Sequence, residues 1–256
     1  MMRHIGNGIA LAFQFFSVIP VKKELPMEKK DVTAMFAALA FLGLLLGGVM
    51  AAIAFLLRDY TDSSSLLAAF LMVLFLAAIT GGLHLDGLAD VGDAYFSYQE
   101  REKRLEIMGD PRIGAFGTMV LLFTVVGKII VISEVIFEIP LVIIVVIPAL
   151  SRTGLLVLFS TANSAKNNGL AFFFQQKANK KGLLATAAIY LIVMMGLLLL
   201  TAGWEAALLL FVIFILTLLL YRRWCLRNFG GVTGDLFGTY IEGAELVLWA
   251  TLLFFI

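Results

Sequence analysis

The chain has 256 residues, of which 61% are hydrophobic and only 14% charged, and its formal net charge is +1. A soluble domain is nearer half apolar and a quarter charged, so this composition excludes an ordinary soluble domain and predicts a polytopic membrane protein. The near-neutral balance argues against a basic surface for nucleic acid, and the single cysteine, Cys225, excludes an internal disulfide.

The first apolar segment, Ile5 to Val21, is short for a membrane-spanning helix. It contains Asn7 and Gln14, and it ends after Pro20 without the small-residue cleavage site of a signal peptide. A helix that crosses a bilayer needs roughly 20 apolar residues. We therefore expect an amphipathic or re-entrant segment at the membrane interface.

Longer apolar runs follow, each close to the length that crosses a bilayer. They are Ala34–Leu57, Leu66–Leu83, Ala115–Ser133, Ile139–Phe159, Leu183–Ala202, Ala206–Tyr221 and Leu236–Ile256. Pro148 and Arg152 in the fourth run predict a kink and an inward-directed arginine. The sequence thus predicts an all-α fold, a polytopic helix bundle with about seven transmembrane helices, forming a single membrane-embedded catalytic domain over residues 1–256.

Positive charge falls almost entirely on alternate connections between these runs. The connections that carry it are 1–33, 84–114, 160–182 and 222–234. The opposite connections hold only Arg58, while Lys128 and Arg152 lie within runs. By the positive-inside rule, we expect a multi-pass protein of the cell membrane with its N-terminus and polar connections in the cytoplasm and its C-terminus outside.

The second of these connections gathers carboxylates in a chain that is otherwise apolar. Asp86, Asp90 and Asp93 stand at i, i+4 and i+7, so they share one face if the segment is helical. Clustered carboxylates repel one another unless a cation or protons compensate, and Mg²⁺ takes such oxygen ligands together with substrate phosphates and water. A solvated loop is the plain alternative, but it seldom spaces acids at helical intervals. The pattern favours a metal–phosphate site at the membrane surface.

Other charged residues fall where they can join this site. Arg112 follows Asp110 after one proline and can hold a phosphate with two hydrogen bonds. Arg152 is expected to meet an anionic group, either a carboxylate of the bundle or a substrate phosphate. Lys128 fits equally well with a functional role or with a side chain that reaches toward the membrane interface.

The last connection contains a glycine-rich stretch that leads into the final apolar run. Thr233, Gly234 and Asp235 lie where a helix would begin, so backbone N–H groups there can face a phosphate, although an ordinary capped loop uses the same residues. Glu242 and Glu245 follow within the run. The stretch opens on the same side of the membrane as the aspartates.

These pieces resemble the cobalamin synthase family, the membrane adenosylcobinamide-GDP ribazoletransferases. The matching segments are Gly81–Asp90 with Asp93, Arg104–Asp110 with Arg112–Gly114, Gly231–Asp235 with Glu242 and Glu245, Ser151-Arg152, and Gly169-Leu170. The resemblance covers nearly the whole chain. The sequence differs from the family pattern at Ser17-Val18, where relatives often have a Thr-Arg pair. It also differs around Phe172–Gln176, so the resemblance implies no substrate contact there.

The resemblance implies an Mg²⁺-dependent enzyme that completes the nucleotide loop of vitamin B12. Such an enzyme joins adenosylcobinamide-GDP to α-ribazole or its 5'-phosphate, giving adenosylcobalamin or its 5'-phosphate and releasing GMP. The expected partners are these two substrates and the lipid bilayer, with no nucleic acid, and a homo-oligomer is left open.

The resemblance also implies roles for particular residues. The metal ligands would be Asp86, Asp90, Asp93 and Asp110. The substrate and phosphate contacts would be Arg112, Arg152, Thr233, Gly234, Asp235 and Glu242. Asp90 or Asp110 would take the proton of the attacking hydroxyl, and His84 would either contact substrate or hold a neighbouring site residue by a hydrogen bond.

Three other classes share parts of the pattern. A CDP-alcohol phosphotransferase requires an Ala-Arg step that the segment Asp86–Asp90 lacks. A membrane prenyltransferase also uses an Asp-x-x-x-Asp pair but expects a second strong aspartate motif. A cation-coupled transporter would place its acids near the bilayer midplane, whereas this cluster is expected at the cytoplasmic edge.

Overall fold

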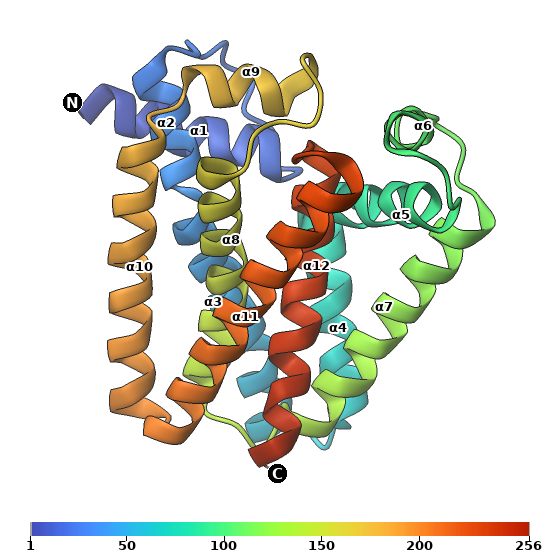
Figure 1. Ribbon diagram of the computed structural model, residues 1–256. Coiled ribbons are helices and arrows are strands. Elements are labelled where there is room, and N and C mark those ends of the chain that lie inside the picture. Colours follow the sequence, from blue (N-terminus) through green and yellow to red (C-terminus); the bar gives the residue numbers. More distant parts are fainter. Residues whose placement is uncertain (1, 256) are drawn as a thin grey trace.

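The computed structural model describes residues 2–255 as an assembly of α-helices (Figure 1). In chain order these are α1 (Met2–Phe16), α2 (Lys29–Ala37), α3 (Leu39–Tyr60), α4 (Ser65–Ile79), α5 (Leu83–Phe96), α6 (Arg101–Ile107), α7 (Ala115–Val135), α8 (Leu141–Thr161), α9 (Gly169–Lys177), α10 (Lys180–Thr201), α11 (Trp204–Phe229) and α12 (Gly234–Thr251), with a short 3₁₀ helix at Leu252–Phe255. Within these residues the only β-type pairing is an isolated bridge between Ser164 and Val232. The predicted all-α class is confirmed.

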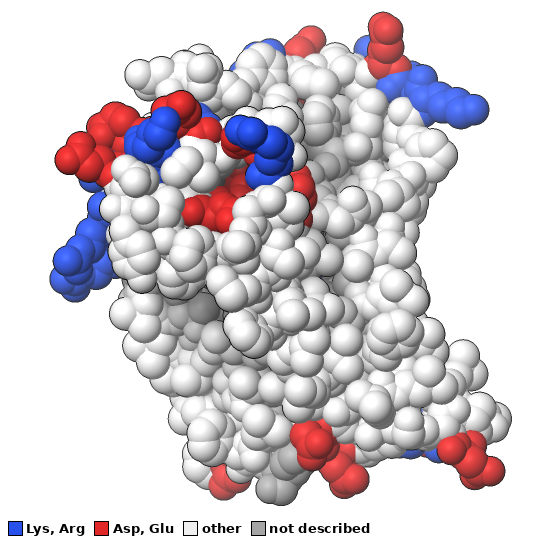
Figure 2. All heavy atoms as spheres, turned by 90° about the vertical axis from the view of Figure 1, so that its right-hand side faces the viewer, with Lys and Arg blue, Asp and Glu red and all other residues white. Residues whose placement is uncertain are grey.

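The helices form a membrane bundle. Among the described residues, 6 helices are long and apolar enough to cross a bilayer, and the number rises to 7 if the bent pair α4–α5 counts as one span. On the face shown in Figure 2, charged side chains gather at the two ends and leave a broad uncharged belt between them. Such a belt is what the hydrocarbon core of a bilayer requires. The prediction of about seven spans is confirmed.

The second predicted run ends earlier than its apolar residues suggest. It reaches Leu83 in the sequence, but α4 ends at Ile79 because Gly81 and Gly82 adopt φ angles of 63° and 74°. Glycine enters this left-handed region without the steric cost that other residues meet, and the helix stops there. The next helix, α5, leaves at 90° to α4 and lies across the end of the bundle (Figure 1).

The first apolar segment folds as α1, which lies at the same end of the molecule as α5 and α9 (Figure 1). Asp31 of α2 is completely buried and accepts hydrogen bonds from His4 Nδ1 at 2.9 Å and Asn7 Nδ2 at 3.1 Å, so α1 is fixed to α2. The helix stops at Phe16, and Val18 N then donates to the carbonyl of Ile79 at 2.8 Å. The segment after α1 is thereby held against the end of α4.

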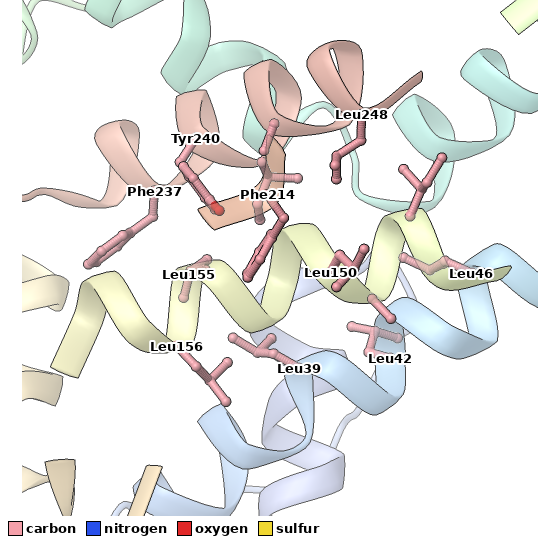
Figure 3. Close-up of a cluster of buried hydrophobic side chains, with 14 of the residues drawn as sticks. Leu39, Leu42, Leu46, Leu150, Leu155, Leu156, Phe214, Phe237, Tyr240 and Leu248 are labelled. Carbon is pink, nitrogen blue, oxygen red and sulfur yellow. The ribbon is translucent and has the colours of Figure 1, made fainter. Parts of the chain in front are cut away.

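Helix α8 forms the centre of the bundle and is buried along most of its length. Figure 3 shows its leucines packed against α3 on one side and against α11 and α12 on the other. Gly43 and Gly47 let α3 approach closely: a Cβ on Gly43 would lie 2.6 Å from Ala149 Cα, and one on Gly47 would lie 2.7 Å from Val145 Cα. Small residues at such crossings let membrane helices gain van der Waals contact.

A substitution at this crossing should weaken the bundle. Gly47→Ala would force its Cβ against the backbone of α8, so we expect a loss of about 1–3 kcal/mol in the free energy of unfolding, typical of overpacking. The measurement is thermal or denaturant unfolding of the purified protein in detergent.

Gly48→Ala is the matched control, because a Cβ at Gly48 meets nothing within 4 Å. It should unfold at the wild-type temperature or slightly higher. Equal stability of the two variants would contradict the close packing of α3 on α8.

Candidate active site

A cavity of about 360 Å³ lies at the end of the bundle where α1, α5, α9 and the start of α12 meet. Seven polar residues and one glycine from three connections are among its lining: His84, Asp86, Ser164, Lys166, Asn168, Thr233, Gly234 and Asp235. Apolar side chains line the rest: Phe15, Phe16, Phe36, Leu83, Leu155, Leu170, Phe174 and Phe237. Segments far apart in the sequence therefore line one cavity.

The crossing of α5 over α12 brings two of these carboxylates to the same cavity. A Cβ on Gly87 would lie 2.8 Å from Asp235 Cα, and one on Gly238 would lie 3.0 Å from His84 Cα. The hydroxyl of Thr239 donates to the carbonyl of Gly87 at 3.1 Å and fastens the crossing. Because the glycines lack side chains, the neighbouring Asp86 and Asp235 can line one cavity.

Backbone pairing brings the third polar connection to the same place. The amide of Val232 donates to the carbonyl of Asn163 at 2.9 Å, and the amide of Ala165 donates to the carbonyl of Val232 at 2.9 Å. The next residue, Lys166, lines the same cavity as Asp235. This connection carried only a weak indication of a site in the sequence.

The aspartates of α5 form a concentrated negative charge. The segment is helical, as the spacing predicted, so Asp86 and Asp90 lie one turn apart on one face. Burial raises the pKa of Asp90 to about 6, and repulsion by Asp86, Asp235 and Asp93 contributes to the rise. Figure 2 shows acidic side chains gathered in a recess at the α5–α6 end of the molecule. A cation would relieve this repulsion.

Asp93 and Asp110 have other partners in this structure. Asp93 caps the start of α7, because its Oδ2 accepts from Gly114 N at 2.6 Å and its Oδ1 from Gly117 N at 2.8 Å. Asp110 accepts from Arg112 Nε at 2.9 Å and Nη2 at 2.6 Å, and these side-chain hydrogen bonds hold the pKa of Asp110 near 2. The Arg112 side chain is 86% exposed. Neither aspartate lines the cavity.

The oxygen-rich donor set fits Mg²⁺ in part. Within residues 2–255, the predicted ligands do not form a group of three whose oxygens lie within 4.8 Å of one another; that spacing is found for His4, Glu28 and Asp31. Mg²⁺ is usually held by one or two carboxylates, with phosphates and water as the other ligands. Asp86 with Asp90 meets that requirement, and Asp235 adds a third carboxylate beside them.

Behind the cavity lies a network of buried ions. Lys128 Nζ contacts Glu242 Oε2 at 2.5 Å and Glu245 Oε2 at 3.0 Å, and Arg152 pairs with the other oxygen of Glu245. All four residues are at most 8% exposed. His84 lies between the network and the cavity: it lines the cavity, and its Nδ1 is 3.9 Å from Glu242 Oε1, which is beyond hydrogen-bond distance.

The network places Arg152 and Glu242 away from the cavity lining. For Arg152, the sequence left open a bundle carboxylate or a substrate phosphate, and the observed partner is the carboxylate of Glu245. Glu242 is occupied by Lys128. Two acids and two bases compensate one another here, which keeps the charges from being isolated in the bundle. Substrate contacts by Arg152 and Glu242 stay predictions.

The sequence carried only a weak indication that α9 and the loop before it line the cavity. Lys166 and Asn168 line the cavity, and so does Phe174, which lies in the stretch where the family resemblance implied no substrate contact. The only signal was composition, namely amides and a lysine followed by three consecutive phenylalanines.

Comparison with known proteins identifies the family. The family model described as cobalamin-5-phosphate synthase matches residues 8–253. The chain belongs to the cobalamin-5-phosphate synthase family. No solved structure gives a significant match.

Several curated relatives have the name adenosylcobinamide-GDP ribazoletransferase. The one from Geobacillus kaustophilus is 30% identical over 253 residues, which cover 98% of this chain and 97% of the relative. The one from Geobacillus thermodenitrificans is 32% identical over 250 residues, covering 97% and 95%. The one from Halalkalibacterium halodurans is 30% identical over 251 residues, with the same coverage. The similarity therefore extends over almost the whole of each chain.

Removing one ion of the buried network should be costly. Lys128→Met leaves Glu242 and Glu245 with one compensating base, so we expect the free energy of unfolding to fall by about 3–5 kcal/mol. Adding Glu242→Gln restores neutrality and should recover part of the loss. The measurement is unfolding in detergent for the single and double variants.

Lys103→Met is the control, because Lys103 Nζ pairs with Glu106 Oε2 at 2.9 Å with both side chains more than half exposed. Its loss should be at most about 1 kcal/mol. If Lys128→Met were as mild as Lys103→Met, the network would not be the stabilising element described above.

Proposed function

We propose that this protein transfers adenosylcobinamide phosphate from adenosylcobinamide-GDP to α-ribazole or α-ribazole 5'-phosphate. The products are adenosylcobalamin or its 5'-phosphate, and GMP. Family membership and the names of the full-length relatives support the proposal. The observation that carries it is the single cavity at which His84, Asp86 and the Thr233–Asp235 turn meet.

The chemistry is an in-line displacement at phosphorus. A hydroxyl oxygen of the ribazole forms a bond to the phosphorus that carries the cobinamide. The bond from that phosphorus to the oxygen bridging the two phosphates breaks, and this oxygen leaves as part of GMP. Such a transfer depends mainly on positioning and on neutralising charge.

We propose that Asp90, rather than Asp110, is the base that accepts the proton of the attacking hydroxyl. Asp90 lies one helical turn after Asp86, which lines the cavity, and it feels the negative charges of Asp86 and Asp235. Asp110 accepts three hydrogen bonds from Arg112, one from its backbone and two from its guanidinium, so its carboxylate is already occupied. A general base has to reach the proton that it takes, and Asp90 is the better placed of the two.

Asp86 and Asp90 are the proposed Mg²⁺ ligands, with Asp235 beside them. When bound, Mg²⁺ would neutralise charge that develops on the phosphate oxygens. Asp86 lines the cavity, so a substrate phosphate placed there can share the ion. Asp93 contributes by fixing α7 against α5, since both of its oxygens accept backbone N–H groups of the segment that starts α7.

We also propose that the cavity opens on the cytoplasmic side of the cell membrane. The N-terminus, α5 and α9 lie at one end of the molecule and the C-terminus at the other (Figure 1). The connections at the cavity end carry most of the lysines and arginines, the bias typical of cytoplasmic loops. A periplasmic-type alkaline phosphatase fused to the C-terminus should be active, and the same reporter fused after Asn179 should be inactive. The reverse pattern would contradict this orientation.

The direct test is an assay with adenosylcobinamide-GDP and α-ribazole 5'-phosphate that follows GMP and the corrinoid product. Wild-type protein should form both, and chelation of divalent metal should stop the reaction until Mg²⁺ is restored. Asp86→Asn should lower turnover by about 100-fold or more, because it removes a charge that positions the reacting groups.

Asp62→Asn is the control, since Asp62 is an exposed acid in the connection between α3 and α4. It should keep wild-type turnover. Full activity in Asp86→Asn would refute the metal assignment, and folded wild-type protein that releases no GMP would refute the proposed reaction.

A further inference from the structure

The cavity beside Asp86 is suited in size to one of the two substrates. Its volume of about 360 Å³ is at the lower end of the range of roughly 300–1,000 Å³ that encloses small ligands. A nucleoside monophosphate fits such a space. A corrin ring with its side chains, its adenosyl group and a guanosine diphosphate is several times larger and has to remain mostly outside.

One wall of the cavity presents preorganised aromatic rings. The Phe174 ring meets Phe15 edge-on with centroids 5.3 Å apart and meets Phe36 edge-on at 5.7 Å. Phe36 is held in turn by stacking on Phe159 at 3.9 Å. Rings fixed in this way can pack against a flat aromatic base without a further loss of side-chain freedom.

The loop before α9 contributes positive charge to the cavity. Lys166 is the only lysine or arginine among the residues that line the cavity. It follows the backbone pairing with Val232, which holds this loop beside the start of α12. A lysine held there suits the terminal phosphate of a nucleotide, and Asn168 adds a neutral polar group.

Asp86 lies at the boundary between this cavity and a second one. The second cavity, of about 530 Å³, shares Phe15, Leu83 and Asp86 with the first. It is otherwise lined by Ser17, by the turn Thr80–Gly82, by α5 and by residues in and just before α7. A ligand in the aromatic cavity therefore places its reactive group next to Asp86, while a second ligand can reach Asp86 from another direction.

We propose that the aromatic cavity is the acceptor site, where α-ribazole or its 5'-phosphate binds. Its base packs against Phe15, Phe36 and Phe174, and its 5'-phosphate, when present, pairs with Lys166. The corrinoid donor presents only its phosphates, at Asp86. This assignment rests on the proposed function, and it adds that Lys166 distinguishes the phosphorylated acceptor from the free nucleoside.

The test compares both acceptors in one variant. Lys166→Gln should raise the KM for α-ribazole 5'-phosphate about tenfold, the usual effect of losing one hydrogen bond to a charged group. Its KM for α-ribazole, and its KM for adenosylcobinamide-GDP, should stay within about twofold of wild type. Lys181→Gln, at an exposed lysine of α10, is the matched control and should change none of the three.

A second variant tests the cavity itself. Leu170 lines the cavity but is 62% exposed, so Leu170→Trp can fill the space without disturbing the core. Calorimetry in detergent should show at least a tenfold loss of affinity for both acceptors relative to wild type.

The outcomes separate this inference from the proposed function. A higher KM for adenosylcobinamide-GDP in Lys166→Gln, with the KM for α-ribazole 5'-phosphate unchanged, would place the donor phosphates at Lys166 and overturn the acceptor assignment. Normal acceptor affinity in Leu170→Trp would also overturn it while leaving the reaction intact. If wild type bound both acceptors in this cavity but formed no product, the acceptor site would stand and the proposed reaction would fall.

Discussion

The close crossing of α5 and α12 is the constraint on which the site depends. Gly87 and Gly238 allow the two backbones to approach so closely that added Cβ atoms would lie 2.8–3.0 Å from the opposing chain. Two consequences follow from this contact. Asp86 and Asp235 line the same cavity, and the buried carboxylates of α12 come within reach of α5. The repulsion among the aspartates is the electrostatic cost, which a cation with bound phosphates would offset.

Behind this crossing, the buried ions hold three long helices in register. Lys128 of α7, Arg152 of α8 and the two glutamates of α12 satisfy one another, so none stands as an isolated charge. A secondary transporter binds its substrate and its coupling ions near the bilayer midplane. Here Lys128 and Arg152 are already paired with the buried carboxylates of α12. The uncompensated negative charge lies at the end of the bundle instead. This arrangement favours a fixed catalytic scaffold.

The sequence predicted what depends on local pattern. Apolar runs indicated the spans, and the spacing of Asp86 and Asp90 indicated a helical face. The 90° bend between α4 and α5 depends on two glycines in the left-handed region, which a hydropathy pattern does not register. Lys166 could not be placed, because its position depends on the backbone pairing of Ser164 with Val232, which lies 68 residues later in the chain. The partners of Arg152 and Glu242 likewise depended on how distant helices pack.

The most direct measurement is the rate of GMP release by Gly87→Ala, a substitution that adds only one methyl group at the crossing. Gly243→Ala on α12 is its matched control, because a Cβ there meets nothing within 4 Å. If the crossing determines the geometry of the site, Gly87→Ala loses most of its turnover while its helix content stays that of wild type. Gly243→Ala keeps the turnover and the helix content of wild type. Wild-type turnover in folded Gly87→Ala would contradict the account, because the aspartates would then function without the close approach that places them.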